Sequence, residues 1–173
     1  RDAQASDPIS AFGGIVACNY KINKKIALEI NQTFFEVILA KGFDKDALRV
    51  LKKKKNMRIV DISKFNYETK TTSRFFDNSF LLQEKDNLVF DKKILRCVTK
   101  NKPSNKELKD IEFAFRVCKY VKSNAIVIVK DNSTIGIGAG QQNRLESCKI
   151  AVQKARKFQP KLLLNSVAAS DAF

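Results

Sequence analysis

The hydrophobic positions in the first part of the chain change their spacing from segment to segment, as they do in proteins that alternate strands and helices. Residues 15–18 form a short apolar run that predicts a strand, and residues 26–34 carry apolar side chains at helical spacing. An apolar run at 35–39 predicts a buried second strand. A shorter helical pattern follows at 44–51, and a third strand is predicted at 57–60. The order strand–helix–strand–helix–strand is typical of an α/β fold.

Polar residues that can cap helices stand before three of the predicted helices. Asn23 and Asp44 precede the first two helical patterns. Ser104 and Glu107 form a capping-box sequence in front of a longer helix, whose apolar face runs to Cys118. The elements predicted after this helix are a strand at 125–129 that is buried on both faces, a returning strand at 134–138, a helix with apolar residues from 145 to 155, and an apolar stretch at 162–169.

The middle of the chain, from about residue 61 to residue 102, has no regular period. Short apolar patches at 75–76, 80–82 and 88–90 lie between polar residues. Patches of this length fit hairpins or an insertion, and their spacing does not specify how they pair.

Composition places the chain among globular domains. Of its 173 residues, 44% are hydrophobic and 29% are charged, which is too apolar for a disordered chain. No apolar run approaches the ~20 residues that cross a bilayer, and no signal-peptide pattern opens the sequence, so we predict a cytoplasmic protein without a membrane partner. Because the sequence lacks an initial Met and stops after an apolar stretch, we also expect it to be truncated at both ends.

The formal net charge is +15, which favours partners that carry negative charge. Nucleic acid, a membrane surface and small substrates rich in phosphate or carboxylate all meet this requirement. The basic residues are scattered except for one run, Lys52 to Lys55, which we interpret as a solvated face. No recognition helix or aromatic stacking motif accompanies the charge, which argues against a nucleic-acid-binding domain.

Histidine is absent from the chain, and its absence excludes several kinds of site. No Ser-His-Asp or Cys-His arrangement can form. The cysteines, at positions 18, 97, 118 and 148, include no Cys-x-x-Cys pair, so a Cys/His zinc site at the usual spacing is excluded as well. We expect these thiols to be buried.

A glycine-rich segment, Ile135 to Gly140, lies between a predicted strand and a predicted helix. Such segments can bring backbone N–H groups close to an anion at the N-terminus of the helix. This one lacks the third glycine of the dinucleotide-binding fingerprint and the Lys-Ser/Thr pair of a P-loop. A strand that packs closely against its neighbours explains the glycines equally well, so both interpretations stay open.

Three polar residues near predicted element ends are candidates for chemistry. Asn124 precedes the central strand, where its amide can orient a carbonyl, stabilise an oxyanion, or merely bind its own backbone at the end of a helix. Arg144 starts a helix, where a cation gains nothing from the helix dipole, so a nearby anion or exposure to water must explain it. Asp171 follows an apolar strand and can bind a cation or cap a further helix.

Several segments together resemble the AICAR transformylases, a family of purine-biosynthesis enzymes. The segments that carry the resemblance are SDPISAFGGIVA at 6–17, KKKNMR at 53–58, KY at 119–120 with SNA at 123–125, IGIGAGQQNR at 135–144 and SDAF at 170–173. The last one matches the start of a motif that continues in the family as Phe-Pro-Phe. Each segment alone is modest, whereas five in the family's order are specific.

The resemblance implies an α/β fold of cytidine-deaminase-like three-layer units, with a mixed sheet flanked by helices and without the zinc of the deaminases. On this basis residues 1–102 are a partial first unit, with an irregular insertion at about 61–102, and residues 103–173 begin a second, truncated unit. The family transfers the formyl group of its co-substrate, 10-formyltetrahydrofolate, to the 5-amino group of AICAR ribotide. Its members also carry an IMP cyclohydrolase domain and work as homodimers with sites at the subunit interface.

The resemblance also implies roles for individual residues. Asn124 matches an asparagine near the reacting amine and formyl group. The residues expected on the ribotide side are Gly13, Glu36, Ala172 and Phe173, the last by stacking. The residues expected on the folate side are Ile9, Phe12, Arg144 and Leu145. A structural potassium site of some members matches Asp171 with oxygens near Val121 and Ser123, although Ala125 stands where a hydroxyl residue can contribute to that site.

One part of the family's pattern has no counterpart in this sequence. The Lys-His pair that handles proton transfer in the family belongs to a Lys-His-x-x-Pro-x-Gly stretch, and nothing here matches it. We therefore expect a central piece of the formyltransferase domain that is inactive alone. The alternative is a non-catalytic α/β domain that binds small anions or nucleic acid, and nucleic-acid affinity would then fall steeply with salt.

Overall fold

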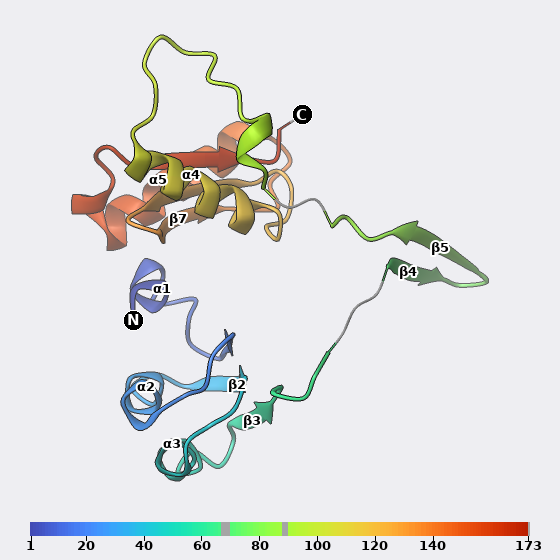
Figure 1. Ribbon diagram of the computed structural model, residues 1–173, viewed down its shortest axis with the longest axis vertical. Helices are drawn as coiled ribbons and strands as arrows, with labels where there is room; N and C mark the ends of the chain where they lie inside the picture. The colour runs from blue at the N-terminus through green and yellow to red at the C-terminus, as the bar shows by residue number, and fades with distance from the viewer. Residues whose placement is uncertain (67–69, 88–89, 173) are drawn as a thin grey trace. The chain divides into compact units, whose positions relative to one another are not determined.

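The computed structural model describes residues 1–66, 70–87 and 90–172 (Figure 1). The predicted apolar patch at 88–90 therefore lies partly outside the described residues, and Phe173 lies outside them. In the part of the chain that is described, no helix is long and apolar enough to cross a membrane.

The chain divides into two compact units. One spans Phe12–Val89 and is called the parallel-sheet unit here. The other combines Arg1–Ala11 with Phe90–Phe173 and is called the antiparallel-sheet unit. The expectation of cytidine-deaminase-like units at 1–102 and 103–173 came from the family resemblance, and it stays a prediction.

The parallel-sheet unit is built on three parallel strands in the order β1-β2-β3. Its elements are β1 (Gly14–Cys18), α2 (Lys24–Ile30), β2 (Phe35–Ala40), α3 (Lys45–Leu51) and β3 (Arg58–Asp61). In β2, Ile38 and Ala40 are fully buried, whereas Val37 and Leu39 are only half-buried. Since alternate residues of a strand face opposite sides, the helices cover one face of the sheet. The predicted alternation of strands and helices is confirmed.

The two predicted helix starts of this unit differ in how they are capped. Asn23 is the N-cap of α2, and its side chain accepts a hydrogen bond from the Ile26 N–H at 3.0 Å, as the sequence predicted. Asp44 stands at the N-cap position of α3 but makes no side-chain cap bond. Its carboxylate pairs instead with Lys21 Nζ at 2.7 Å.

The irregular middle segment contains a hairpin, as the apolar patches suggested. Strands β4 (Thr71–Phe76) and β5 (Ser79–Glu84) pair antiparallel through a tight turn in which Asp77 has a φ of +41°. Every position of both strands is exposed, including the rings of Phe75 and Phe80, whose centroids lie 6.1 Å apart. The next element of the described chain is a 3-10 turn, η1 (Lys92–Ile94).

The antiparallel-sheet unit is built on three strands in the order β7-β6-β8, with both outer strands antiparallel to β6. Its main elements are α1 (Asp2–Ser6), α4 (Asn105–Cys118), β6 (Ile126–Lys130), β7 (Ser133–Gly138), α5 (Arg144–Phe158), η2 (Pro160–Leu162) and β8 (Val167–Ser170). The predicted capping box of α4 is present: the Glu107 N–H donates to Ser104 Oγ at 3.3 Å, and the Ser104 N–H donates to Glu107 Oε2 at 2.8 Å.

Helices α4 and α5 cover opposite faces of this sheet. Val127 and Val129 of β6 pack in one cluster with Ala114 of α4. Ile128 of β6 packs in a separate cluster with Ala151 of α5. Because consecutive residues of a strand point to opposite faces, the sheet is the middle of three layers, and the predicted burial of the central strand on both faces is confirmed. The fold class is thus α/β. Helices flank both three-stranded sheets, and one of these sheets is parallel whereas the other is antiparallel.

Glycines let β7 pack directly against α5. A Cβ on Gly136 would lie 2.1 Å from the Ala151 carbonyl oxygen, and a Cβ on Gly138 would lie 1.8 Å from the Ser147 carbonyl oxygen. Both separations are far inside van der Waals contact. Of the two interpretations of the glycine-rich segment, close packing is confirmed at these positions.

A buried carboxylate on α4 holds the turn between β6 and β7. Asp110 is 2% exposed, and its oxygens accept hydrogen bonds from the Asn132 N–H at 2.7 Å and the Asp131 N–H at 3.1 Å. Both turn residues have positive φ, +53° at Asp131 and +55° at Asn132, as in the tight turns that suit antiparallel strands. The carboxylate thus supplies acceptors for backbone N–H groups that the turn itself leaves unpaired.

Replacing Asp110 by alanine is expected to lower the free energy of unfolding by about 2–3 kcal/mol, because two N–H groups lose a charged acceptor. Chemical denaturation of the full-length protein measures the change. Lys106→Ala is the matched control, because it removes only an exposed ion pair with Asp131 at 2.6 Å and should therefore cost much less than Asp110→Ala. Equal effects of the two substitutions would show that the turn does not depend on Asp110.

Candidate functional site

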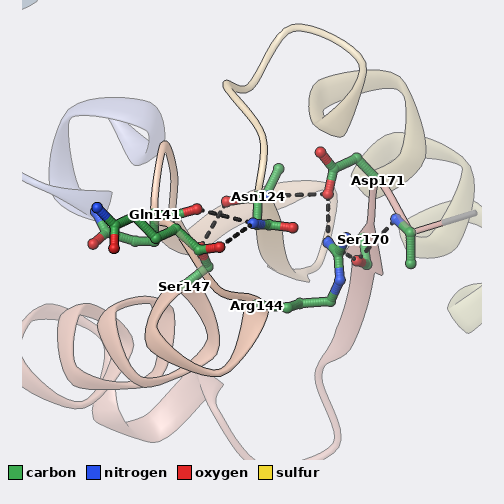
Figure 2. Close-up of polar contacts among 9 residues, drawn as sticks. Asn124, Gln141, Arg144, Ser147, Ser170 and Asp171 are labelled. Atoms are coloured by element: carbon green, nitrogen blue, oxygen red, sulfur yellow. Dashed lines mark hydrogen bonds and ion pairs between the residues drawn. The ribbon is translucent and has the colours of Figure 1, made fainter.

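Three segments of the antiparallel-sheet unit meet where β6 begins and β8 ends (Figure 2). They are the loop before β6, which carries Asn124, the loop that leads into α5, which carries Gln141, and the end of β8, which is followed by Asp171. The antiparallel register explains why they meet, because Ile126 at the start of β6 pairs with Ser170 at the end of β8.

The side chain of Asn124 is fixed by the loop that leads into α5. Its Nδ2 donates to the backbone carbonyls of Gln141 at 2.9 Å and Gln142 at 3.2 Å, and its backbone N–H donates to the Gln141 carbonyl at 3.2 Å. The Asn124 carbonyl accepts a hydrogen bond from Ser147 Oγ at 2.6 Å, and Ser147 is fully buried. The partners of Asn124 therefore lie far along the chain, so it does more than end a helix on its own backbone.

These contacts determine which atom of the Asn124 amide is available. Both partners of the side chain are carbonyl oxygens, which only accept, so the atom that faces them is the nitrogen. Both amide hydrogens are used, and Oδ1 points away from the two carbonyls (Figure 2). A ligand at this position would meet a hydrogen-bond acceptor. The arrangement suits an amine or amide N–H, whereas an oxyanion requires a donor.

The anion beside Arg144 is the carboxylate of Asp171. Arg144 Nη1 donates to Asp171 Oδ1 at 2.5 Å and to Ser170 Oγ at 2.8 Å. The Ala125 N–H donates to the same carboxylate oxygen at 2.9 Å. A hydrogen bond from the Ser123 side chain, the bond from the Ala125 N–H and the Arg144 guanidinium together hold the pKa of Asp171 well below its usual range. This pairing explains the unfavourable position of Arg144 at the start of a helix.

Asp171, the one carboxylate among the residues expected to hold potassium, has another partner in this structure. Asp171 is ion-paired with Arg144, so the charge of its carboxylate is already compensated. Among the described residues, no group of three or more His, Cys, Asp or Glu side chains could hold a metal ion. These contacts do not fit a cation at Asp171 Oδ1, and the potassium site stays a prediction.

The paired carboxylate of Asp171 predicts an acid-sensitive contribution to stability. Its pKa is lower in the folded chain than in the unfolded one, so the contribution is complete above the unfolded value of about 3.9 and is lost as the pH falls toward the folded value. We expect Asp171→Asn to lower the free energy of unfolding of the full-length protein at neutral pH. The difference between the variant and the unaltered protein should shrink below about pH 4. A difference that stays constant in denaturation curves across this range would contradict the assignment.

A second group of expected site residues lies at the amino ends of the strands in the parallel-sheet unit. Gly13, with a φ of +73°, donates its N–H to the Phe34 carbonyl at 2.9 Å, and a Cβ at Gly13 would lie 4.0 Å from Glu36 Oε1. The rings of Phe12 and Phe34 have centroids 5.5 Å apart. Arg58 Nη1 lies 3.9 Å from Glu36 Oε2. The structure thus places Phe12, Gly13 and Glu36 in one unit, beside the starts of β1 and β2.

The remaining expected residues are placed at the surface. Ile9 and Leu145 are exposed apolar side chains in the antiparallel-sheet unit. Ala172 is also exposed, and its N–H donates to Ser170 Oγ at 3.2 Å. Phe173 lies outside the described residues, so its expected stacking role stays a prediction.

Sequence reasoning missed two residues and misjudged two thiols. Ser147 is a buried polar residue on a helix face that is otherwise apolar. This break in the apolar pattern is the sequence signal that could have identified it. Arg58 belongs to a segment that had been noted only for its resemblance. Cys97 and Cys148 are exposed, so the expectation of buried thiols is wrong for these two, although it holds for the other cysteines.

Comparison with known proteins places these features in a family. A family model described as AICARFT/IMPCHase bienzyme matches residues 1–154. The Bifunctional purine biosynthesis protein PurH of Thermoanaerobacter sp. (strain X514) is 44% identical over 171 residues, which is 99% of this chain and 33% of that protein. The proteins of the same name from Bacillus cereus (strain AH187) and Bacillus thuringiensis (strain Al Hakam) are each 45% identical over 174 residues, again 99% of this chain and 33% of the relative.

The fold and the sites define an α/β protein whose candidate functional groups are amides, carboxylates and guanidinium groups near the ends of strands. The chain belongs to the AICARFT/IMPCHase bienzyme family, since the family model matches most of its length. It spans about a third of the length of the curated relatives that it matches. The resemblance drawn from the five sequence segments is confirmed.

Proposed function

We propose that this chain contributes to a phosphoribosylaminoimidazolecarboxamide formyltransferase, which moves the formyl group of 10-formyltetrahydrofolate to the 5-amino group of AICAR ribotide and forms formyl-AICAR. Membership of the family supports the assignment. The structural observation that carries it is Asn124, whose amide hydrogens are both engaged and whose Oδ1 remains available to receive an N–H. A substrate amine has the complementary chemistry.

In the proposed reaction, the amine nitrogen attacks the formyl carbon. A bond forms between these two atoms, the bond from the formyl carbon to N10 of the folate breaks, and the proton lost by the amine ends on N10. Asn124 Oδ1 accepts the other N–H of the amine, which orients the nitrogen lone pair toward the formyl carbon. Correct orientation of two bound reactants can contribute ~7–11 kcal/mol of the barrier reduction. The Lys-His pair that moves the proton in the family is not present in this sequence.

Other residues keep the roles that the resemblance gave them, as part of the same proposal. Gly13, Glu36, Ala172 and Phe173 contact the ribotide, and Ile9, Phe12, Arg144 and Leu145 contact the folate. Since Arg144 Nη1 is bound to Asp171 and Ser170, a folate contact would use the remaining N–H groups of the guanidinium. The proposal includes cytidine-deaminase-like units without zinc and a homodimer with sites at the subunit interface. Potassium takes part in no step.

A formyl-transfer assay tests the proposal. The full-length protein, with AICAR ribotide and 10-formyltetrahydrofolate, should turn over, and the 173-residue chain alone should not. If the full-length protein shows no turnover, the enzyme assignment fails. Salt-sensitive binding of nucleic acid by such an inactive protein would then favour a binding domain.

A further inference from the structure

The turn that carries Ile9, residues 7–10, is organised by the carboxylate of Asp7. The Ser10 N–H donates to Asp7 Oδ1 at 3.0 Å, and Ser10 Oγ donates to Asp7 Oδ2 at 2.8 Å. Aspartate often closes a turn in this way, by accepting hydrogen bonds from residues just after it. Ile9 lies within the turn and is 66% exposed. The position of its side chain therefore depends on where Asp7 is held.

Asp7 is anchored by Lys154 of α5, which is 147 positions away in the chain. Lys154 Nζ donates to Asp7 Oδ2 at 2.6 Å, and the two side chains are 38% and 20% exposed. An ion pair that is partly buried is screened less by salt than one in open solvent. Although burial alone would raise the pKa of the Asp7 carboxyl, hydrogen bonds from Lys154 and Ser10 lower it overall. The carboxylate is therefore charged at neutral pH, as the ion pair requires.

A hollow of about 430 Å³ lies where the turn approaches β7 and α5. The chain just before the turn is packed, since Ser6 is 7% exposed and Thr134 Oγ1 lies 3.5 Å from Ser6 Oγ. Beyond Ser6, side chains leave space between the turn and the helix, and the ion pair crosses the wall of that space. The residues that line the hollow are Ser6, Asp7, Ile137, Ala139, Gln141, Ile150 and Lys154.

Helix α5 connects this turn to the Asn124 site. Ser147, whose Oγ donates to the Asn124 carbonyl at 2.6 Å, precedes Lys154 by seven positions on the helix. Seven residues make about two helical turns, so the two side chains leave α5 from the same side. One rigid helix thus holds both the group proposed to receive the amine and the turn that carries Ile9.

We propose that Lys154 is a positioning residue, which acts through Asp7 to hold the turn that carries Ile9 against the folate. This role rests on the proposed function, which gives Ile9 to the folate side. On the ribotide side, Gly13 has a separate anchor, since its N–H donates to the Phe34 carbonyl at 2.9 Å. Loss of Lys154 should therefore disturb the folate more than the ribotide.

Steady-state kinetics of the full-length protein test this role. Lys154→Met keeps most of the aliphatic stem and removes the charge, so it should raise the KM for 10-formyltetrahydrofolate about tenfold, since a small misplacement of a positioning group has large effects. The KM for AICAR ribotide should change less than about twofold. Lys154→Arg keeps a charged donor and should restore most of the loss. Lys149→Met is the matched control, because it removes an exposed ion pair with Glu146 at 2.8 Å on the same helix and should change neither KM.

A double-variant cycle shows whether Lys154 acts through Asp7. Asp7→Asn combined with Lys154→Met should raise the KM for the folate no further than the worse of the two single substitutions, because both remove the same contact. Additive effects would mean that Lys154 acts by another route and would overturn its role. Equal losses for folate and ribotide would also overturn it, because they indicate a general loss of structure.

Hydrogen exchange, measured on peptides of the full-length protein, separates this role from the enzyme assignment. The Ser10 N–H, which is bonded to Asp7, should exchange faster in Lys154→Met than in the unaltered protein, whereas the Gly13 N–H should exchange at the same rate in both. Faster exchange at Ser10 in a protein that binds no folate would support the hold of Lys154 on the turn while the enzyme assignment failed. Unchanged exchange at Ser10 would overturn the role of Lys154, whether or not the protein turns over its substrates.

Discussion

Asn124→Ala in the full-length protein is expected to lower the turnover number of formyl transfer about 10²–10³-fold, the loss typical of removing one positioned hydrogen-bonding group from a reacting centre. Two effects add in the same direction. The variant removes the acceptor Oδ1 that would hold the amine, and it leaves the Gln141 and Gln142 carbonyls without their amide donor. Steady-state kinetics with both substrates measure the change. Full turnover in the variant would remove Asn124 from the mechanism.

A ligand analogue and a control variant separate chemistry from structure at this site. An AICAR ribotide with hydrogen in place of the 5-amino group offers no N–H to Oδ1, so it should bind the unaltered protein and Asn124→Ala equally well. The ribotide itself should bind the variant more weakly. Asn143→Ala is the matched control, because Asn143 caps α5 through the Glu146 N–H at 2.9 Å and does not contact Asn124 through its side chain. It should cost about 1 kcal/mol of stability and leave turnover nearly unchanged.

Gly138→Ala is expected to lower the free energy of unfolding by about 3 kcal/mol or more, at the upper end of overpacking effects. The added Cβ would lie 1.8 Å from the Ser147 carbonyl oxygen and 2.8 Å from the Ser147 Cα, so it meets backbone that cannot rotate away. Helix α5 would have to move from β7. Turnover should fall as well, because Ser147 Oγ holds the Asn124 carbonyl at 2.6 Å and would move with the helix.

Gly140→Ala provides the comparison for Gly138→Ala. At Gly140 a Cβ would have its nearest neighbour, Lys122 Cβ, at 4.0 Å, so the only cost is the positive φ of +67°, about 1–2 kcal/mol. Chemical denaturation of both variants of the full-length protein makes the comparison. Equal losses would mean that α5 does not pack directly on the backbone of β7, contrary to the structure.

Local spacing was sufficient to place most helices and strands. The capping box of Ser104 and Glu107, the cap at Asn23 and the apolar run before Lys130 depend on residues close in sequence, and these were predicted correctly. The short helix α1 (Asp2–Ser6) was missed, since five residues carry too little periodicity to separate a helix from a turn. Its position in the antiparallel-sheet unit depends on contacts with residues far along the chain, such as the pairing of Asp7 with Lys154 at 2.6 Å.

By itself, the sequence determined the α/β class, the family and the residue types available for chemistry, because these follow from periodicity, motif order and composition. Only the tertiary structure decided what the candidate residues do to one another. Asn124 and Gln141 are separated by 17 positions, and Arg144 and Asp171 by 27, so neither pair follows from local pattern. The orientation of the Asn124 amide and the ion pair of Arg144 arise where β6 and β8 pair and α5 closes over them. Such contacts depend on which strands become neighbours, and long-range packing determines which strands do so.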